Sequence, residues 1–428
     1  MSNPQAGNDA IHTERDWALR LDGSDPLASY RERFVGVDET MPGTPQAYFD
    51  GNSLGRPLLA SIQRITDFVQ HDWGTRLIRS WDEQWLELPH RVGDALASAA
   101  LGAAPGQTII GDSTTVMLYK FIRAAVAYQL DRDPTRTELV IDTDNFPTDR
   151  YLVEGIANEL GLSVRWIEVD RAAGVTLEQL QEVLSERSNT VVLSQVAYRS
   201  GYLADVPALT RAAHGAGALV LWDLCHSAGS VPTELDTWQV DLAVGCTYKY
   251  LNGGPGSPAF GYVRAELQPL LRQPIQGWIG HADPFAMGPG YEPGPGMRRF
   301  ISGTVPVTGM LAMQDTIELI AEVGIAAIRQ KSLALTEYAI ELSDAWLAPH
   351  GVTVASPRDG QWRGGHVTLS HPAMREVNAR LWADDIIPDY RDPGGLRIGL
   401  SPLSTSFEEV WFGMNAVRDT LREVIGLS

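Results

Sequence analysis

Residues 218–229 read ALVLWDLCHSAG, and residues 242–256 read LAVGCTYKYLNGGPG. Each stretch begins with an apolar run of the kind that fits a strand covered on both faces of a parallel sheet. The first run ends at Asp223, and the second leads through Tyr248 to Lys249 at the start of a glycine-rich turn. Because ligands bind at the carboxyl ends of such strands, these two stretches predict both the fold and the location of a functional site.

The same alternation of apolar runs and helical patterns continues on both sides of these stretches. Seven runs fit buried strands: Thr108–Gly111, Glu138–Asp142, Ser163–Glu168, Thr190–Gln195, Ala218–Asp223, Leu242–Cys246 and Ala259–Val263. Helical patterns lie between several of them, at Thr114–Leu130, Arg150–Leu160, Leu177–Glu186 and Val206–Gly215. This alternation predicts an α/β fold whose mostly parallel, seven-stranded sheet is covered by helices on both faces.

A glycine- and proline-rich stretch, His281–Gly309, separates this region from the C-terminal part of the chain. It is too punctuated for long regular elements, and its aromatic and arginine residues favour an ordered loop at a site over a disordered linker. Helical patterns beyond it lead to a smaller α+β unit. We therefore predict an N-terminal segment (1–75) packing with the small domain, a large domain (76–309) and a small C-terminal domain (310–428).

Composition narrows the possible partners. The chain has 428 residues and a formal net charge of −19, which disfavours nucleic acids and anionic membranes but still allows an anionic ligand at a local cluster of arginines. The N-terminal residues are polar, and no apolar run is long enough for a membrane helix. Cys225 and Cys246 stand in apolar stretches, so we expect buried reduced thiols and a cytoplasmic protein.

Asp223 and Lys249 form the first candidate pair of chemical groups. An aspartate at the end of one buried strand and a lysine at the end of a later one are the pair that pyridoxal phosphate (PLP) requires. The lysine amine bonds to the aldehyde of the cofactor, and the carboxylate keeps the pyridine nitrogen protonated so that the ring accepts electrons. Taken singly, Asp223 could instead cap a helix, and Lys249 could be a surface residue.

A phosphate site is predicted where GDSTTVML (111–118) passes from a strand into a helix. Helix N-termini attract phosphate, and Thr114 and Thr115 are candidate contacts, although simple capping by Ser113 or Thr114 explains the hydroxyl residues equally well. In NFPTD (145–149), Phe146 could lie over the cofactor ring or pack in the core, and Asp149 could cap the next helix.

Taken together, these motifs resemble kynureninase, a member of the fold type I, aspartate-aminotransferase-like PLP enzymes. The matching segments are YFDGNSLG (48–55), GTRLIRSW (74–81), NFPTD (145–149), WDLCHSAG (222–229), GCTYKYLNGGPGSPAF (245–260), GWIGH (277–281), YEP (291–293), SGT (302–304), RQKSLALT (329–336) and DYRDPGGLRIGLSPL (389–403). The aspartate–lysine pair marks only the superfamily, whereas TYKYLNGGPGS, GWIGH and LRIGLSPL are much more specific. The resemblance implies hydrolytic cleavage of L-kynurenine to anthranilate and L-alanine, in the kynurenine pathway of tryptophan catabolism and NAD biosynthesis.

The resemblance also implies roles for individual residues. Lys249 matches the lysine that holds PLP, Tyr248 a phosphate contact that takes part in proton transfer, and Arg397 the arginine that binds the substrate carboxylate. The remaining matches to cofactor contacts are Thr114, Thr115, Phe146, Asp149, Ser194, Asp223 and His226, with Trp278 and Thr304 contributed by the neighbouring subunit of a homodimer. The remaining matches to substrate contacts are Trp81, Asn52, His281 and Gly303. No metal is implied.

Alternatives remain open at this point. Arg397 could be an ordinary exposed residue of a short strand, although arginine geometry suits a carboxylate clamp. The rival functions are another fold type I enzyme, such as a cysteine desulfurase or class V aminotransferase, and a non-catalytic PLP-binding protein. No G-x-G-x-x-G motif follows an early strand, which disfavours a nicotinamide-binding protein.

Trp81 and Gly303 resemble the bacterial branch of the family, which favours plain L-kynurenine over 3-hydroxykynurenine. An indole wall and a glycine offer a substrate hydroxyl no certain hydrogen-bond partner, a loss of roughly 1–3 kcal/mol. In the alternative interpretation, Trp81 is core packing and Gly303 is only a turn residue.

Overall fold

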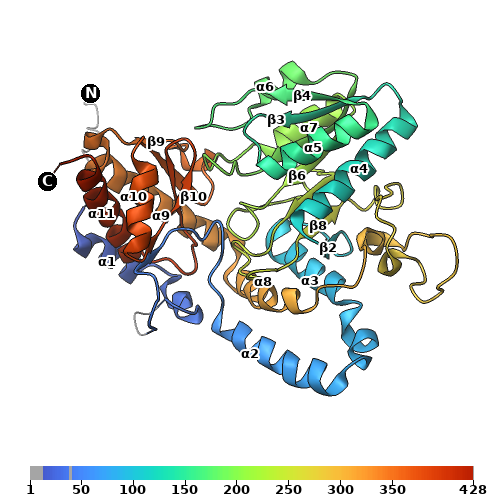
Figure 1. Cartoon of the computed structure of the whole chain (residues 1–428), viewed down its shortest axis with the longest axis horizontal. Helices are drawn as coiled ribbons and strands as arrows, with labels where there is room; N and C mark the ends of the chain where they lie inside the picture. Colours follow the sequence, from blue (N-terminus) through green and yellow to red (C-terminus); the bar gives the residue numbers. More distant parts are fainter. Residues whose placement is uncertain (1–12, 38–40, 428) are drawn as a thin grey trace, which may run out of the picture.

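The computed structural model describes residues 13–37 and 41–427. Its largest layer is a seven-stranded sheet, whose strands spread from the label β4 down to the label β2 among the green and teal helices of Figure 1. The strands are β2 (Thr108–Ile110), β3 (Glu138–Asp142), β4 (Ser163–Ile167), β5 (Ser188–Ser194), β6 (Leu219–Asp223), β7 (Leu242–Gly245) and β8 (Phe260–Val263), in the spatial order β2-β8-β7-β6-β5-β3-β4. All neighbours are parallel except β8, which runs antiparallel to β2 and β7. The predicted α/β class and mostly parallel sheet are confirmed.

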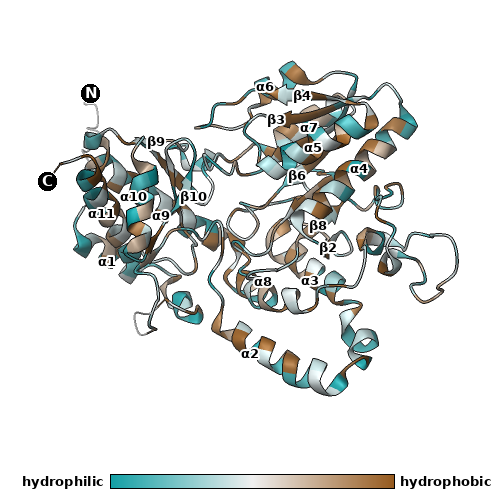
Figure 2. Ribbon diagram, viewed as in Figure 1, coloured by the Kyte–Doolittle hydropathy of each residue, from teal (hydrophilic) through white to brown (hydrophobic). Residues whose placement is uncertain are grey.

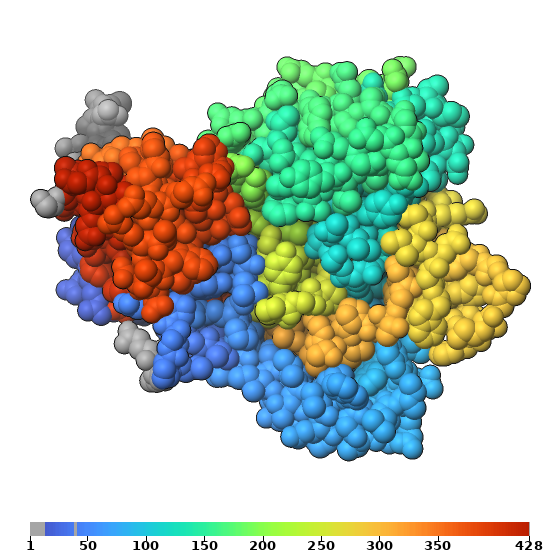
Figure 3. All heavy atoms as spheres, viewed as in Figure 1, coloured from blue at the N-terminus to red at the C-terminus, as the bar shows by residue number. Residues whose placement is uncertain are grey.

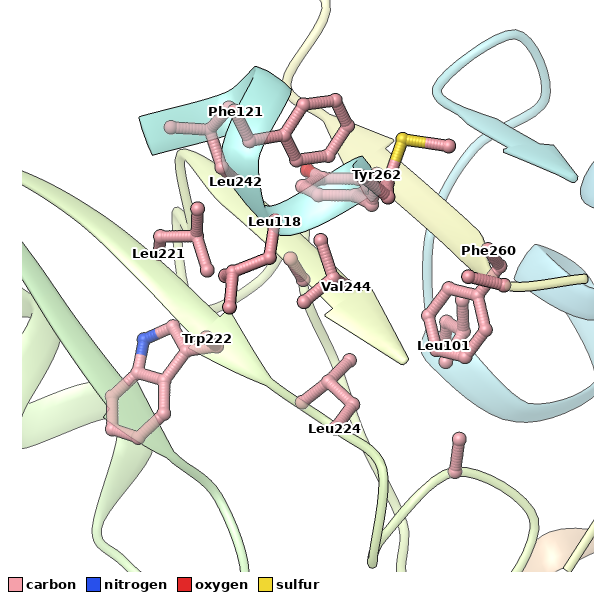
Figure 4. Close-up of a cluster of buried hydrophobic side chains, with 14 of the residues drawn as sticks. Leu101, Leu118, Phe121, Leu221, Trp222, Leu224, Leu242, Val244, Phe260 and Tyr262 are labelled. Atoms are coloured by element: carbon pink, nitrogen blue, oxygen red, sulfur yellow. The ribbon is translucent and has the colours of Figure 1, made fainter. Parts of the chain in front are cut away.

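Helices cover both faces of this sheet: α4 (Thr114–Arg132), α5 (Pro147–Leu160), α6 (Leu177–Val183) and α7 (Val206–Gly215). α5 begins three residues earlier than the sequence pattern predicts, because Pro147 supplies a first helical residue that needs no hydrogen-bond partner for its nitrogen. Figure 4 shows part of this core, where Leu118 and Phe121 of α4 lie over Leu221 of β6 and Val244 of β7. Strands buried in this way read as continuous apolar runs, which is why the sequence located them well.

The C-terminal part forms a second core around an antiparallel sheet of order β12-β13-β10-β9. Its elements are α9 (Ile325–Trp346), β9 (Thr353–Val354), β10 (His366–Ser370), α10 (Met374–Ala383), β11 (Ile386–Ile387), β12 (Asp389–Arg391), β13 (Gly395–Gly399) and α11 (Phe407–Val424). α8 (Leu311–Val323) packs in the first core, and the core changes along α9 between Ile328 and Leu335. The predicted boundary at residue 310 therefore stays a prediction.

The N-terminal segment reaches across both cores. α1 (Arg15–Ser24) packs against α11, and β1 (Ala47–Tyr48) pairs in parallel with β11. α2 (Leu59–Asp67) then runs beside α8 along the lower edge of Figure 1 and continues into the π-helical segment η2 (Phe68–Arg76). Pairing of β1 with β11 agrees with the expected packing of this segment on the small domain.

Short helical elements complete the described chain: η1 (Ala28–Arg33), η3 (Trp81–Trp85), α3 (Leu88–Leu96), η4 (Ala97–Leu101), η5 (Trp278–Gly280), η6 (Gly296–Phe300), η7 (Thr308–Met310), η8 (Ala348–His350) and η9 (Gly360–Trp362). The glycine- and proline-rich stretch protrudes as the gold lobe of Figure 3. Buried Met297 and Phe300 anchor it to the large domain. Among the described helices, none is long and apolar enough to cross a membrane.

Candidate functional site

The site begins where β5, β6 and β7 end side by side. The pairing register sets Ser194 opposite Asp223, and Asp223 opposite Val244. Four residues after the end of β7, the chain delivers Lys249, which is buried. Parallel strands therefore bring two polar side chains and the lysine from different parts of the sequence to one edge of the sheet.

Lys249 is the one lysine of the chain without a carboxylate partner of its own among the described residues. The sequence contains three lysines, Lys120, Lys249 and Lys331. Lys120 is paired with Asp112 and Lys331 with Asp25, and both ammonium groups are buried. A lysine committed to a buried ion pair is not free to bond a cofactor, because losing the pair leaves an uncompensated charge.

Two aromatic rings flank the amine of Lys249. Its Nζ lies 6.0 Å from the ring centroid of Phe146 and 6.0 Å from that of Tyr248. Phe146 directly precedes α5 and is 39% exposed, so one face of its ring is open beside the lysine. An open aromatic face next to a reactive amine suits a planar aromatic cofactor better than it suits core packing.

The N-terminal segment fixes the backbone of the lysine turn. The N–H of Gly55 donates to the carbonyl of Tyr248 at 2.9 Å. A Cβ on Gly55 would lie 2.2 Å from the carbonyl oxygen of Lys249, so only glycine allows this approach. Within the turn, Asn252 takes a positive φ of 52° and Gly253 N–H donates to Thr247 at 2.8 Å. The YFDGNSLG motif thus acts partly by supporting Lys249.

The side chain of Asp223 stabilises a turn and does not cap a helix. Its Oδ1 accepts a hydrogen bond of 2.7 Å from the N–H of Cys225, and no helix begins in the described residues that directly follow. The helix-cap interpretation of Asp223 is therefore wrong in this structure. Asp149 lies close enough that Asp223 raises its pKa, although burial is the larger cause, while Lys249 acts in the opposite direction.

The imidazole of His226 is buried where the charges of both Lys249 and Arg397 act on it. Burial holds the pKa of its imidazole well below the usual range, and the charges of Lys249 and Arg397 lower it further. A neutral imidazole is therefore present at pH 7, and its Nδ1 is buried without a hydrogen-bond partner in the described part of the chain. The ring meets His366 edge-on, with centroids 5.6 Å apart.

The phosphate candidates lie at the start of α4. Asp112 has a positive φ of 53°, and Ser113 caps the helix by accepting from the N–H of Val116 at 3.4 Å. Thr114 is half-buried and Thr115 exposed, in the first turn of the helix. The capping alternative thus holds for Ser113, and it leaves both threonines and the first-turn N–H groups available to an anion.

These residues fit PLP. Asp149 Oδ2 and His226 Nδ1 are buried polar atoms that have no hydrogen-bond partner among residues 13–37 and 41–427, and a buried polar group without a partner costs free energy that a ligand can recover. The carboxylate of Asp223, the open face of Phe146 and the N-terminus of α4 match, respectively, the pyridine nitrogen, the ring and the phosphate of the cofactor. Lys249 would bond its aldehyde.

Arg397, on β13, lies in a buried charge cluster and not on the surface. Its side chain is 1% exposed, donates to the carbonyl of Tyr198 at 2.7 Å and to Ser53 Oγ at 3.0 Å, and forms an ion pair with Asp389. Its Nε is buried without a partner among the described residues. The exposed-strand interpretation is wrong, and a free buried guanidinium N–H suits a carboxylate ligand.

Asp50 adds a titratable group to this cluster. Burial is the largest cause that raises the pKa of its carboxyl to about 6, Asp389 raises it as well, and Ser53, Arg397 and Arg391 act in the opposite direction. Arg391 also lies 3.1 Å from the carboxylate of Asp389. Protonation of Asp50 near pH 6 therefore removes one negative charge from this cluster.

Not every predicted residue joins Lys249 within one chain. Asn52 does approach the cluster, since a Cβ on Gly399 would lie 1.8 Å from Asn52 Oδ1, and neither polar atom of its buried amide has a partner in the part of the chain that the structure describes. The contacts of the described residues leave the others on separate segments, and these are Trp81, Trp278, His281, Gly303 and Thr304. Trp81 packs edge-on against Trp85 at 5.3 Å, and His281 lies near Tyr291.

Sequence reasoning missed several polar residues of the site. Asp50, Ser53 and Asp389 stand inside motifs that marked the resemblance, so their position was a usable signal. His366 had no signal, because it lies in an ordinary strand pattern and meets His226 only through the fold.

Comparisons with known proteins point in one direction. Residues 328–417 match the family model of the kynureninase C-terminal domain. Kynureninase from Pseudomonas fluorescens is 40% identical over 412 residues, which cover 96% of this chain and 96% of that protein. Kynureninase from Burkholderia pseudomallei strain 1106a is 41% identical over 408 residues, 95% of each.

Solved structures share the fold at lower identity. A cysteine desulfurase from Thermococcus onnurineus NA1 superimposes with a TM-score of 0.74 at 19% identity, over 88% of this chain and 95% of that one. A mutant of C-DES with glycine covalently linked to its PLP cofactor gives a TM-score of 0.78 at 18% identity, over 90% and 98%. These likenesses concern the fold alone.

The charge of Asp223 is expected to hold the cofactor. Asp223→Asn keeps an acceptor for the N–H of Cys225 but removes the charge, so the protein should fold normally. It should bind PLP at least about tenfold more weakly, a loss of roughly 1.4 kcal/mol or more, measured by absorbance titration. Wild-type affinity in the folded Asp223→Asn protein would show that the carboxylate does not face the pyridine nitrogen.

Asp50 is expected to make ligand binding at Arg397 depend on pH. Its folded pKa of about 6 is raised, so the neutral form below pH 6 leaves the cluster more positive and favours a carboxylate. The ratio of the wild-type dissociation constant for L-alanine to that of Asp50→Asn should grow roughly 3- to 10-fold between pH 5 and pH 7.5. Exposed Asp419 provides the control, because Asp419→Asn should leave the ratio flat. A flat ratio for Asp50→Asn contradicts the assignment.

Proposed function

Because the chain belongs to the kynureninase family, with 40% identity to a kynureninase over 96% of its length, we propose that it hydrolyses L-kynurenine. Water and L-kynurenine give anthranilate and L-alanine, so the enzyme is a hydrolase acting on a carbon–carbon bond. PLP is its cofactor. One observation carries the proposal: the N–H of Gly55 donates to the carbonyl of Tyr248 beside Lys249, and Ser53, two residues earlier, accepts from Arg397 at 3.0 Å. A cofactor-holding amine and a carboxylate-binding guanidinium therefore serve one small ligand, an amino acid.

In the proposed reaction, different residues bind the cofactor, bind the substrate and transfer protons. Bound PLP supplies the electron-accepting ring that makes the substrate Cα–H and Cβ–Cγ bonds breakable. Asp223 holds the proton of the pyridine nitrogen, and Phe146 and neutral His226 confine the ring. Arg397 orients the substrate through its carboxylate, and the amine of Lys249 takes the proton from the substrate Cα.

Tyr248 is the proposed proton donor to the substrate Cβ, which becomes the methyl carbon of L-alanine when the Cβ–Cγ bond breaks. Burial raises the pKa of its phenol, so the hydroxyl keeps its proton at neutral pH and can pass it to a carbanion. The backbone contact between Tyr248 and Gly55 holds the ring next to Lys249. Before this transfer, water adds to the side-chain ketone at Cγ, so that when the Cβ–Cγ bond breaks, Cγ leaves as the carboxylate of anthranilate and Cβ takes up the proton.

The rival desulfurase function lacks a suitable sulfur acceptor. Cys246 is buried, and its N–H donates to Cys225 Sγ at 3.2 Å. Neither thiol stands on a mobile exposed loop. A non-catalytic PLP-binding protein would have no use for the buried cluster around Arg397. Two free cysteines also support the cytoplasm as the proposed compartment.

A homodimer with shared active sites is the proposed assembly. Along α2, η2 and the two residues after η2, large apolar side chains are exposed, namely Leu59, Ile62, Ile65, Val69, Trp73, Leu77 and Ile78. The brown bands on α2 in Figure 2 show part of this row. Exposed apolar patches of this extent mark interfaces. Trp278 is 41% exposed and Thr304 is exposed as well, as side chains that reach a neighbouring subunit must be.

We propose that the aromatic ring of the substrate packs against a wall of the site that lies beside this surface and includes Trp81. Trp81 lines an apolar cavity of about 470 Å³ together with residues of η2 and residues 305–309. A Cβ on Gly303 would meet nothing within 4 Å, so that position is open. A second subunit that covers this cavity would bring Trp81 and Gly303 to the ring of a substrate held at Lys249.

The direct test is chromatography of L-kynurenine incubated with the protein and PLP. Anthranilate and L-alanine should form in equal amounts, and Lys249→Ala should form neither. The same assay with 3-hydroxykynurenine should give turnover with a lower kcat/KM, because the wall at Trp81 offers its hydroxyl no certain partner. Absence of anthranilate from the wild type would contradict the proposed function, and a higher kcat/KM for 3-hydroxykynurenine would contradict only the account of the wall.

Shared sites predict complementation between defective subunits. Thr304→Asp places a negative charge where a phosphate contact is proposed, and Lys249→Ala removes the amine, so each variant alone should be inactive. Mixed after reversible dissociation, they should recover about a quarter of wild-type activity, since half of the dimers are mixed and each has one intact site. A fully active monomer by sedimentation, or no recovery in verified mixed dimers, contradicts the shared site.

A further inference from the structure

Lys120 is a buried ammonium that the proposed reaction does not use. Its side chain is 0% exposed in α4, and its Nζ contacts the carboxylate of Asp112, the carbonyl of Phe300 and the hydroxyl of Ser302, the last at 3.1 Å. Ser302 also donates to Asp112 Oδ2 at 3.3 Å. One amine therefore joins two segments that are about 190 residues apart in the sequence.

Both segments belong to the phosphate end of the site. Asp112 occupies the turn between β2 and α4 with a positive φ of 53°, and its carbonyl accepts from Ala259 N–H at 2.9 Å. The next three residues form the start of α4, where the phosphate contacts Thr114 and Thr115 are proposed. Ser302 is followed directly by Gly303 and Thr304.

The charge of Asp112 is the reason an amine is needed here. The positive end of a helix dipole and its free N–H groups attract an anion. A carboxylate two residues before Thr114 competes for that positive end and repels a phosphate dianion unless a cation neutralises it. Lys120 is that cation among the described residues, since its Nζ forms an ion pair with Asp112.

A purely structural role explains the arrangement less well. Burial lowers the pKa of Lys120, and the charge of Asp112 opposes this shift. The ion pair therefore forms in spite of the free-energy cost of removing both charges from water. An apolar side chain in the same space would often stabilise the protein more than a buried ion pair does. The pair stands beside the proposed phosphate site and not elsewhere in α4, which links it to cofactor binding.

We propose that Lys120 is a positioning residue that neutralises Asp112 and thereby keeps the N-terminus of α4 receptive to the phosphate of PLP. Through Phe300 and Ser302 it also ties this turn to the segment that carries Thr304. The inference deepens the proposed function, because it assumes that the phosphate of PLP binds at α4.

The test compares PLP with pyridoxal, which lacks the phosphate, on the full-length protein freed of cofactor. Lys120→Met leaves Asp112 unpaired, so PLP affinity should fall roughly 10- to 100-fold while pyridoxal affinity changes less than about threefold. Adding Asp112→Asn to Lys120→Met should restore most of the PLP affinity. Asparagine suits this control because it tolerates the positive φ of Asp112.

Asp112→Asn alone covers the case in which Lys120→Met does not fold. It keeps the amine and removes the carboxylate, so PLP should bind at least as tightly as to the wild type. Equal losses for PLP and pyridoxal in Lys120→Met, no recovery in the double variant, or weaker PLP binding to Asp112→Asn would each overturn the proposal. These affinities are independent of kynurenine turnover, so failure of the proposed function is seen separately in the product assay.

Discussion

The structure depends on one constraint: several carboxylates are buried together at the site, with few cations beside them. Asp142, Asp149 and Asp223 lie at or near the carboxyl ends of the central strands. Burial is the largest cause that raises the pKa of Asp142 to about 6 and that of Asp149 well above its usual range. Lys249 is the cation that opposes the shift at Asp149. A protonated pyridine ring bound here would add a positive charge and a hydrogen-bond donor beside these carboxylates.

The small domain and the N-terminal segment complete the site from the opposite side. Gly55 supports the backbone at Lys249, while Ser53 accepts from Arg397 on β13. Arg397 is thereby held close to the segment that supports the lysine. In the proposed reaction, the first core positions the cofactor and the second core positions the carboxylate of the substrate.

Local sequence patterns predicted the fold well and the site in part. Strands such as β3 and helices such as α7 have the predicted bounds, because burial on both faces and capping leave strong local signals. The electrostatic effect of Arg397 on Asp50 and the ring contact between His226 and His366 depend on the approach of distant segments, for which one sequence carries no local pattern. The role of Trp81 was likewise beyond prediction from spacing, since η2 and η3 are π-helical and its cavity depends on residues 305–309.

The central claim is that Lys249 alone holds PLP, and the scarcity of lysines makes it directly measurable. Borohydride reduction of the PLP-loaded protein, followed by peptide mass spectrometry, identifies the modified lysine among Lys120, Lys249 and Lys331. The structure predicts one pyridoxyl group per chain, on Lys249. A pyridoxyl group on Lys120 or Lys331, or none on a protein that has bound PLP, would contradict the account.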